Sequence, residues 1–223
     1  MSCKSVVNRA IWSGGIAGPC FRAAGSSPEA PDRKSRACHR AGANLGFLFH
    51  AQEQTDEART HFEAALAITR ELGNRRLEGN IIGALGRLHQ DRGEVEQAGA
   101  HYESALAIHR EVSDRRSEGS ILAYMASLLH RHGSIDAARE ALATGEPLLR
   151  QLDARLELGK LLCIRAEIER GSGNTAVALT TLSEAEHLAF AIGSGPDSEL
   201  GRMIAKLRQV LTAKLSHQGR ACV

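Results

Sequence analysis

The strongest constraint on the fold is a segment that the chain repeats after forty residues. The sequence HFEAALAITRELGNRR at 61–76 returns as HYESALAIHREVSDRR at 101–116. Weaker copies extend the repeat to four windows: 41–80, 81–120, 121–160 and 161–200. A period of this length indicates a stack of similar structural units, because one such unit cannot bury its apolar face alone.

Each window is predicted to form a helical hairpin. Alanine recurs at the same place in all four windows, and a large apolar residue follows four positions later, on the same face of a helix. These pairs are Ala58 with Phe62, Ala98 with Tyr102, Ala138 with Leu142, and Ala178 with Leu182. Helix breakers occur twice per window, for example at Gly73 and Gly93, and Asn74 and Asp114 are suitable N-caps. The best-formed unit predicts helices over 75–91 and 95–112.

The composition of the chain agrees with a helical, soluble protein. Only 4% of the 223 residues are aromatic, and Ala and Leu dominate, which favours helix over sheet. The net charge of +2 gives no reason to expect a nucleic-acid partner or an acidic membrane surface. The five cysteines have neither disulfide nor zinc spacing, and no apolar run approaches the roughly 18 residues that would span a bilayer. We therefore expect a cytoplasmic protein.

Three segments are predicted along the chain. Residues 1–31 are rich in Gly, Ser, Pro and Arg, show no helical or strand period, and are expected to form a disordered basic leader. Residues 32–215 form the repeat domain, and its last helix, over 197–215, is expected to cover the end of the stack. Residues 216–223 are expected to form a disordered tail. Within the third unit, Pro147 is expected to bend or fray its helix.

The repeated residues carry a family resemblance. The first window contains Leu45, Gly46, Phe49, Ala58 and Phe62, and the second contains Ile82, Leu85, Gly86, His89, Ala98 and Tyr102. This spacing resembles the tetratricopeptide repeat, whose pattern is W-x2-L-G-x2-Y followed by A-x3-F. The period of forty differs from the usual one of about 34 and is similar to repeats of kinesin light chains and of bacterial signalling proteins. The resemblance implies an all-α solenoid of about four stacked hairpins, wound into a right-handed superhelix with a final capping helix.

Catalytic and metal-binding interpretations have weak support. The stretch GSGNTA at 171–176 fits a dinucleotide fingerprint, but that motif requires a preceding strand, and a helix is predicted here. His130 and His132 are two residues apart on a predicted helix, so their side chains point about 200° apart and cannot hold one ion. The many Arg and Glu residues are expected to form solvated helix faces. We expect no enzyme activity, no metal and no cofactor.

The resemblance also implies a concave groove, lined by the second, fifth, sixth and ninth positions of each unit. Small or apolar residues take some of these positions: Ala43, Phe47, Gly83, Ala84, Ala123, Cys163 and Ile164. The predicted partner-binding residues are Arg40, Asn44, Asn80, Arg87, Ser120, Tyr124, Ser127, Lys160 and Glu167. Such side chains can hydrogen-bond the backbone of an extended peptide. The alternative that they are merely solvated stays open. Ala43 and Phe47 do not match the Lys and Asn of the chaperone-binding subclass.

The sequence therefore predicts a non-catalytic module that binds a partner protein or peptide in its groove. An alternative is a regulatory or sensor fragment of a larger bacterial signalling ATPase, kinase or transcription regulator. Neither the identity of the partner nor the oligomeric state follows from the sequence.

Overall fold

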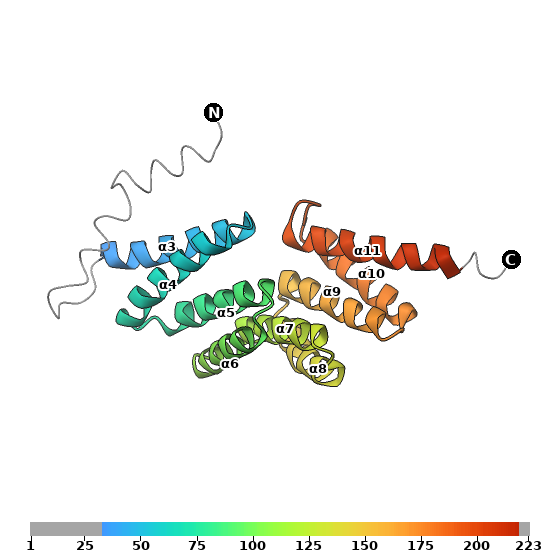
Figure 1. The fold of residues 1–223 in the computed structure, drawn as a ribbon, viewed down its shortest axis with the longest axis horizontal. Coiled ribbons are helices and arrows are strands. Elements are labelled where there is room, and N and C mark those ends of the chain that lie inside the picture. Colours follow the sequence, from blue (N-terminus) through green and yellow to red (C-terminus); the bar gives the residue numbers. More distant parts are fainter. Residues whose placement is uncertain (1–32, 219–223) are drawn as a thin grey trace, which may run out of the picture.

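The chain winds as a series of helices along an open arc (Figure 1). The computed structural model describes residues 33–218; the predicted leader and residues 219–223 lie outside this range. The helices are α3 (Arg33–Ala51), α4 (Thr55–Glu71), α5 (Arg75–Asp91), α6 (Val95–Glu111), α7 (Arg115–Arg131), α8 (Ile135–Gln151), α9 (Arg155–Gly171), α10 (Thr175–Ala191) and α11 (Glu199–Gln218). The predicted all-α solenoid is confirmed.

Consecutive helices form four antiparallel hairpins, α3–α4, α5–α6, α7–α8 and α9–α10, which stack on one another. Helices α3, α5, α7 and α9 lie on the inner side of the arc, and α4, α6, α8 and α10 lie on its outer side (Figure 1). We call these two sets the inner and the outer helices.

The last helix, α11, covers the end of the stack by packing on α9 and α10. It buries Leu200, Leu207 and Leu211, so the last helix lies where the sequence predicted a cover for the stack. The helix continues to Gln218, past the predicted boundary at residue 215.

The turns between helices follow one another at intervals of twenty residues. A residue with positive φ ends each turn: Glu53, Gly73, Gly93, Ser113, Gly133, Asp153, Gly173 and Gly193, with φ between 47° and 85°. The forty-residue unit thus consists of two halves of equal length.

In two of these turns, the residue after the positive-φ position both closes one helix and caps the next. The Asn74 N–H donates to the carbonyl of Thr69 at 3.1 Å and closes α4, while its side chain accepts from the Leu77 N–H at 3.2 Å and caps α5. Asp114 repeats this arrangement: its N–H donates to the His109 carbonyl at 2.8 Å, and its carboxylate accepts from the Ser117 N–H at 3.1 Å. Both predicted N-caps are confirmed, and they explain why α5 begins where the sequence indicated.

The inner and outer helix of a hairpin approach closely where the repeat places Gly or Ala. A Cβ on Gly46 would lie 2.6 Å from the ring of Phe62, and one on Gly86 would lie 2.7 Å from the ring of Tyr102. The third and fourth units carry alanine at this position and leucine in place of the aromatic residue. These pairs are Ala126 with Leu142 and Ala166 with Leu182, and all four residues are buried. Where the inner helix has alanine in place of glycine, the outer helix therefore has leucine in place of the larger aromatic residue.

Of the two effects expected of Pro147, a bend or fraying of its helix, the fraying does not occur. Helix α8 runs from Ile135 to Gln151 with Pro147 inside it, and Pro147 itself is exposed. Its neighbour Glu146 accepts hydrogen bonds from Arg165 on α9 at 2.7 Å and from Arg150 at 2.8 Å. Arg165 takes the repeat position of Leu45 and Leu85, and its ion pair with Glu146 joins adjacent units.

The expectation that the many Arg and Glu residues form solvated helix faces is wrong for three buried glutamates, Glu78, Glu118 and Glu169, of which the first two are repeat-equivalent. Glu78 is 6% exposed and Glu118 is 3% exposed. Each is held by an arginine from the preceding outer helix and one from its own helix: Glu78 by Arg70 at 3.0 Å and Arg75 at 2.6 Å, and Glu118 by Arg110 at 2.8 Å and Arg115 at 2.9 Å. Burial raises the pKa of Glu118, but hydrogen bonds from Arg110 and Arg115 outweigh it, and the pKa lies below its ordinary value. These clusters join successive hairpins.

Candidate partner-binding surface

The predicted groove residues divide into a set that is accessible on the inner helices and a set that is buried. Arg40 and Asn44 are exposed, and the others that we predicted are half-buried: Asn80, Arg87, Ser120, Tyr124, Ser127, Lys160 and Glu167. The residues at the fifth position of each unit (Ala43, Gly83, Ala123 and Cys163) are buried instead. A Cβ on Gly83 would lie 2.6 Å from the side chain of Ile121 on α7, so this position faces the next unit and not the groove.

The buried Cys163 is not a candidate nucleophile. Burial, with smaller effects of the Glu186 and Glu167 charges, raises the pKa of its thiol to about 12. The thiol is therefore protonated at neutral pH, whereas the reactive form of cysteine is the thiolate.

Arg87 and Tyr124, two of the predicted partner-binding residues, contact each other across adjacent units on the inner helices. The Arg87 guanidinium carbon lies 4.8 Å from the centroid of the Tyr124 ring, within the range of a cation–π interaction. The same guanidinium donates to the Tyr124 hydroxyl at 3.4 Å. The Tyr124 ring stacks in turn on Tyr102, with the centroids 6.2 Å apart.

Gln90 belongs to this surface, although the sequence did not single it out. Its amide nitrogen donates to the Ser127 hydroxyl on α7 at 3.2 Å, and its amide oxygen accepts from the Tyr102 hydroxyl at 2.7 Å. Gln90 lies three residues after Arg87 on the same helix, so the two share a face. The spacing of three residues from Arg87 was the signal by which the sequence could have identified Gln90.

Glu199, the first residue of α11, is a second unpredicted member. One carboxylate oxygen accepts from Arg87 on α5 at 2.8 Å, and the other accepts from Lys160 on α9 at 2.5 Å. Burial raises the pKa of Glu199, but Arg87 and Lys160 outweigh this and hold the pKa below its ordinary value. Arg87 and Glu199 are 112 positions apart, so no local pattern in the sequence indicates that they meet.

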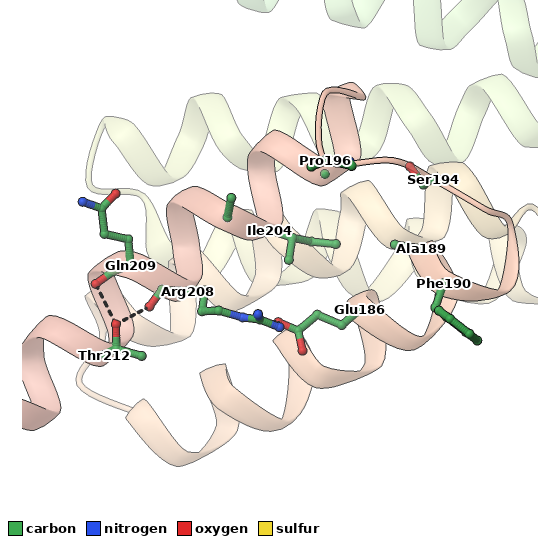
Figure 2. Close-up of a pocket in the computed structure, with 11 residues that line it drawn as sticks. Glu186, Ala189, Phe190, Ser194, Pro196, Ile204, Arg208, Gln209 and Thr212 are labelled. Carbon is green, nitrogen blue, oxygen red and sulfur yellow. Dashed lines mark hydrogen bonds and ion pairs between the residues drawn. The ribbon is translucent and has the colours of Figure 1, made fainter.

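A separate pocket of about 570 Å³ lies between α10 and α11 (Figure 2). Ala189, Ile204 and the exposed Phe190 supply apolar surface, and Arg208 forms an ion pair with Glu186 at 2.6 Å. The sequence analysis did not predict this pocket.

Within residues 33–218, no cluster of three or more His, Cys, Asp or Glu side chains has the arrangement of a metal site. Among the same residues, no helix has the length and apolar character needed to cross a membrane. The GSGNTA stretch forms the turn between α9 and α10, where Gly173 has a φ of 85°.

Comparisons with known proteins agree with this architecture. Two tetratricopeptide repeat models match, one over residues 39–98 and the other over residues 81–116. The comparison with curated protein sequences gives no match.

Solved structures resemble the fold at low sequence identity. The crystal structure of BtubC (BKLC) from P. vanneervenii superposes with a TM-score of 0.65 and 16% identity, covering 86% of this chain and 77% of that one. A Rap protein in complex with Competence and Sporulation Factor gives a TM-score of 0.49 and 17% identity, covering 83% of this chain and 54% of that one. Residues 39–116 therefore match tetratricopeptide repeat models, and the structure continues the same forty-residue helical hairpins to residue 191.

Proposed function

We propose that the inner face of the solenoid binds an extended segment of a partner protein and carries out no catalysis. Tetratricopeptide repeats generally mediate interactions between proteins. The observation that carries the proposal is the convergence of Arg87 and Tyr124, from adjacent units, at the middle of this face. Arginine and tyrosine are enriched among the residues that dominate binding energy at interfaces.

Hydrogen-bonding groups beside this pair suit the backbone of an extended peptide. Asn80 on α5 and Ser117 on α7 lie 3.4 Å apart, hydroxyl to amide oxygen. Ser120 and Ser127 add hydroxyl groups farther along α7. At the first inner helix, Phe47 is 40% exposed and offers apolar contact area. Together these groups supply donors and acceptors for main-chain amides and one apolar anchor.

A paired capture experiment tests the proposal. The immobilised protein is exposed to native lysate, and the retained proteins are identified by mass spectrometry for three forms of the chain. The groove variant carries Arg87→Glu and Tyr124→Ala. The matched control carries Arg59→Glu and Glu103→Ala, at exposed positions of the outer helices α4 and α6.

We expect the groove variant to lose the partner, and the outer-face control to retain it. Loss of a dominant contact weakens binding by about 2 kcal/mol or more, which is at least about 30-fold in affinity. Circular dichroism must show equal helical content in all three forms. Retention of the partner by the groove variant together with its loss from the outer-face variant would refute the proposal.

A further inference from the structure

Two cations of the inner face, Arg87 and Lys160, meet a carboxylate that belongs to the chain itself. Glu199 divides its oxygens between Arg87, at 2.8 Å, and Lys160, at 2.5 Å. Its side chain is 37% exposed, while those of Arg87 and Lys160 are 28% and 17% exposed. The carboxylate therefore lies on the solvent side of two largely covered cations, where another molecule can reach it.

Arg87 and Lys160 contribute two positive charges to this cluster, and Glu199 contributes one negative charge. Asp91, one turn after Arg87 on α5, bonds to His50 at 2.9 Å, and its charge also acts on Arg87. Two cations that share one directly bonded carboxylate can accept a second carboxylate, and opposite charges held in a partly desolvated site attract more strongly than in water.

Glu199 can leave the cations without displacing its helix. The next residue, Leu200, is fully buried, and its side chain lies where a Cβ on Gly159 of α9 would meet it at 2.9 Å. Leu207 and Leu211 bury the following turns of α11. Because these leucines hold the helix, rotation of the Glu199 side chain alone would uncover Arg87 and Lys160.

We propose that Arg87 and Lys160 form an anion site for an acidic side chain of the bound partner, and that Glu199 occupies this site in the free protein. This inference rests on the proposed function of the inner face and adds the chemistry of its ligand. The glutamate keeps the two cations in position and competes with the incoming carboxylate. A partner must therefore offer more than a single acidic residue, since it has to displace an intramolecular one.

Binding of a fluorescein-labelled hexaglutamate peptide, followed by fluorescence anisotropy at low salt, tests this inference. Glu199→Gln removes the competing charge and keeps the side-chain shape. Glu103→Gln removes the same charge from the exposed surface of α6 and is the matched control. A labelled hexaglutamine peptide measures binding that does not depend on carboxylates. Glu199→Asp shortens the side chain by one methylene group, which should weaken its bridge between the two cations, and provides a second variant if Glu199→Gln folds poorly.

We expect Glu199→Gln to bind hexaglutamate at least about fivefold more tightly than the native chain, since couplings between competing groups are typically of this size or larger. Glu199→Asp should show a smaller gain, and Glu103→Gln should match the native chain. Adding Arg87→Gln or Lys160→Gln to Glu199→Gln should abolish the gain.

An equal gain for Glu199→Gln and Glu103→Gln would show general electrostatic attraction and would overturn the inference. No gain for either glutamate-199 variant would also overturn it. If the Arg87→Glu and Tyr124→Ala variant still loses its protein partner in that case, the proposed function stands while the acidic ligand is rejected.

Discussion

At each crossing of an inner and an outer helix, two residues share a fixed space. Gly86 faces Tyr102 in the second unit, whereas the third unit has Ala126 with Leu142. Close-packed interiors do not absorb an added methyl group without strain. Replacing glycine by alanine on the inner helix, together with the aromatic residue by leucine on the outer helix, therefore keeps the distance between the two helices similar from one unit to the next.

This compensation predicts the outcome of a double-mutant cycle. Gly86→Ala alone should destabilise the protein by about 1–3 kcal/mol, because its Cβ meets the Tyr102 ring. Tyr102→Leu alone should also destabilise it, since the hydroxyl bond to Gln90 is lost. The double variant, measured by urea unfolding, should recover at least about 0.5 kcal/mol relative to the sum of the two. Simple additivity would contradict this account of the crossing.

His109 makes the fold sensitive to acid. It is fully buried, and within the described residues neither ring nitrogen has a hydrogen-bond partner. Burial lowers the pKa of its imidazole, against a smaller opposing effect of Asp114 and alongside Arg76, which also lowers it. The unfolded chain, with a histidine pKa near about 6.5, then binds the proton more readily than the folded chain. Stability should therefore fall as the pH drops below about 6.5.

The repeat itself suggests the variant that removes this sensitivity. Leu149 takes the same position in the third unit and packs on Gly119, as His109 packs on Gly79. His109→Leu should raise the thermal midpoint, and by a larger amount at pH 5 than at pH 8. An equal shift at both pH values would show that His109 is not the group that titrates.

At the scale of the elements, the turns set the geometry of the stack. Their positive-φ residues recur every twenty positions, but Glu53, Ser113 and Asp153 hold this conformation without being glycine. The left-handed conformation is costly for residues that carry a Cβ. These three turns are therefore strained where the other five are not.

Ser113→Gly should stabilise the protein by up to about 1 kcal/mol, because glycine adopts this conformation without a steric penalty. Gly73→Ser, at the repeat-equivalent position one unit earlier, should destabilise it by a similar amount. Thermal melts of both variants measure the effect. Changes of the same sign in the two would contradict the assignment of strain to these turns.

The helix boundaries could be predicted closely from the sequence, whereas the burial of charged side chains could not. The N-caps Asn74 and Asp114 and the glycine breakers are local signals, so they determined where helices begin and end. The burial of Glu78 and Glu118 depends on arginines of the preceding outer helix, and local spacing alone cannot distinguish such a pair from a solvated one. The sequence did hold one signal of a shared structural role: each of these glutamates follows an arginine by eight positions, and the pair recurs after forty residues.

At the scale of the whole molecule, the repeat pattern predicted the stacking of adjacent units but not the contact between α5 and α11. Arg87 and Tyr124 meet because adjacent units have the same register, which the sequence specifies. The contact of Arg87 with Glu199 depends on the curvature that accumulates from α5 to α11, and curvature results from small rotations at each interface.

The end of the stack gives a prediction at this scale. Ending the chain at Gly193 removes Leu200, Leu207 and Leu211, all buried against the preceding helices. The shortened protein should melt at a lower temperature and associate at high concentration, because terminal units without a polar cover expose apolar surface. A variant with Arg202→Ala and Lys206→Ala, on the exposed side of α11, should melt like the native chain. Equal melting of the shortened and native chains would show that α11 does not stabilise the stack.

The bridge made by Glu199 also has a mechanical consequence. A solenoid whose units touch only their neighbours extends under load like a coil spring, with the compliance of every interface in series. The ion pair between α5 and α11 links these two helices directly, so it shares the load with the helix interfaces that lie between them. That part of the arc should resist extension more than the segment formed by α3 and α4, which therefore yields first when the two ends are pulled apart.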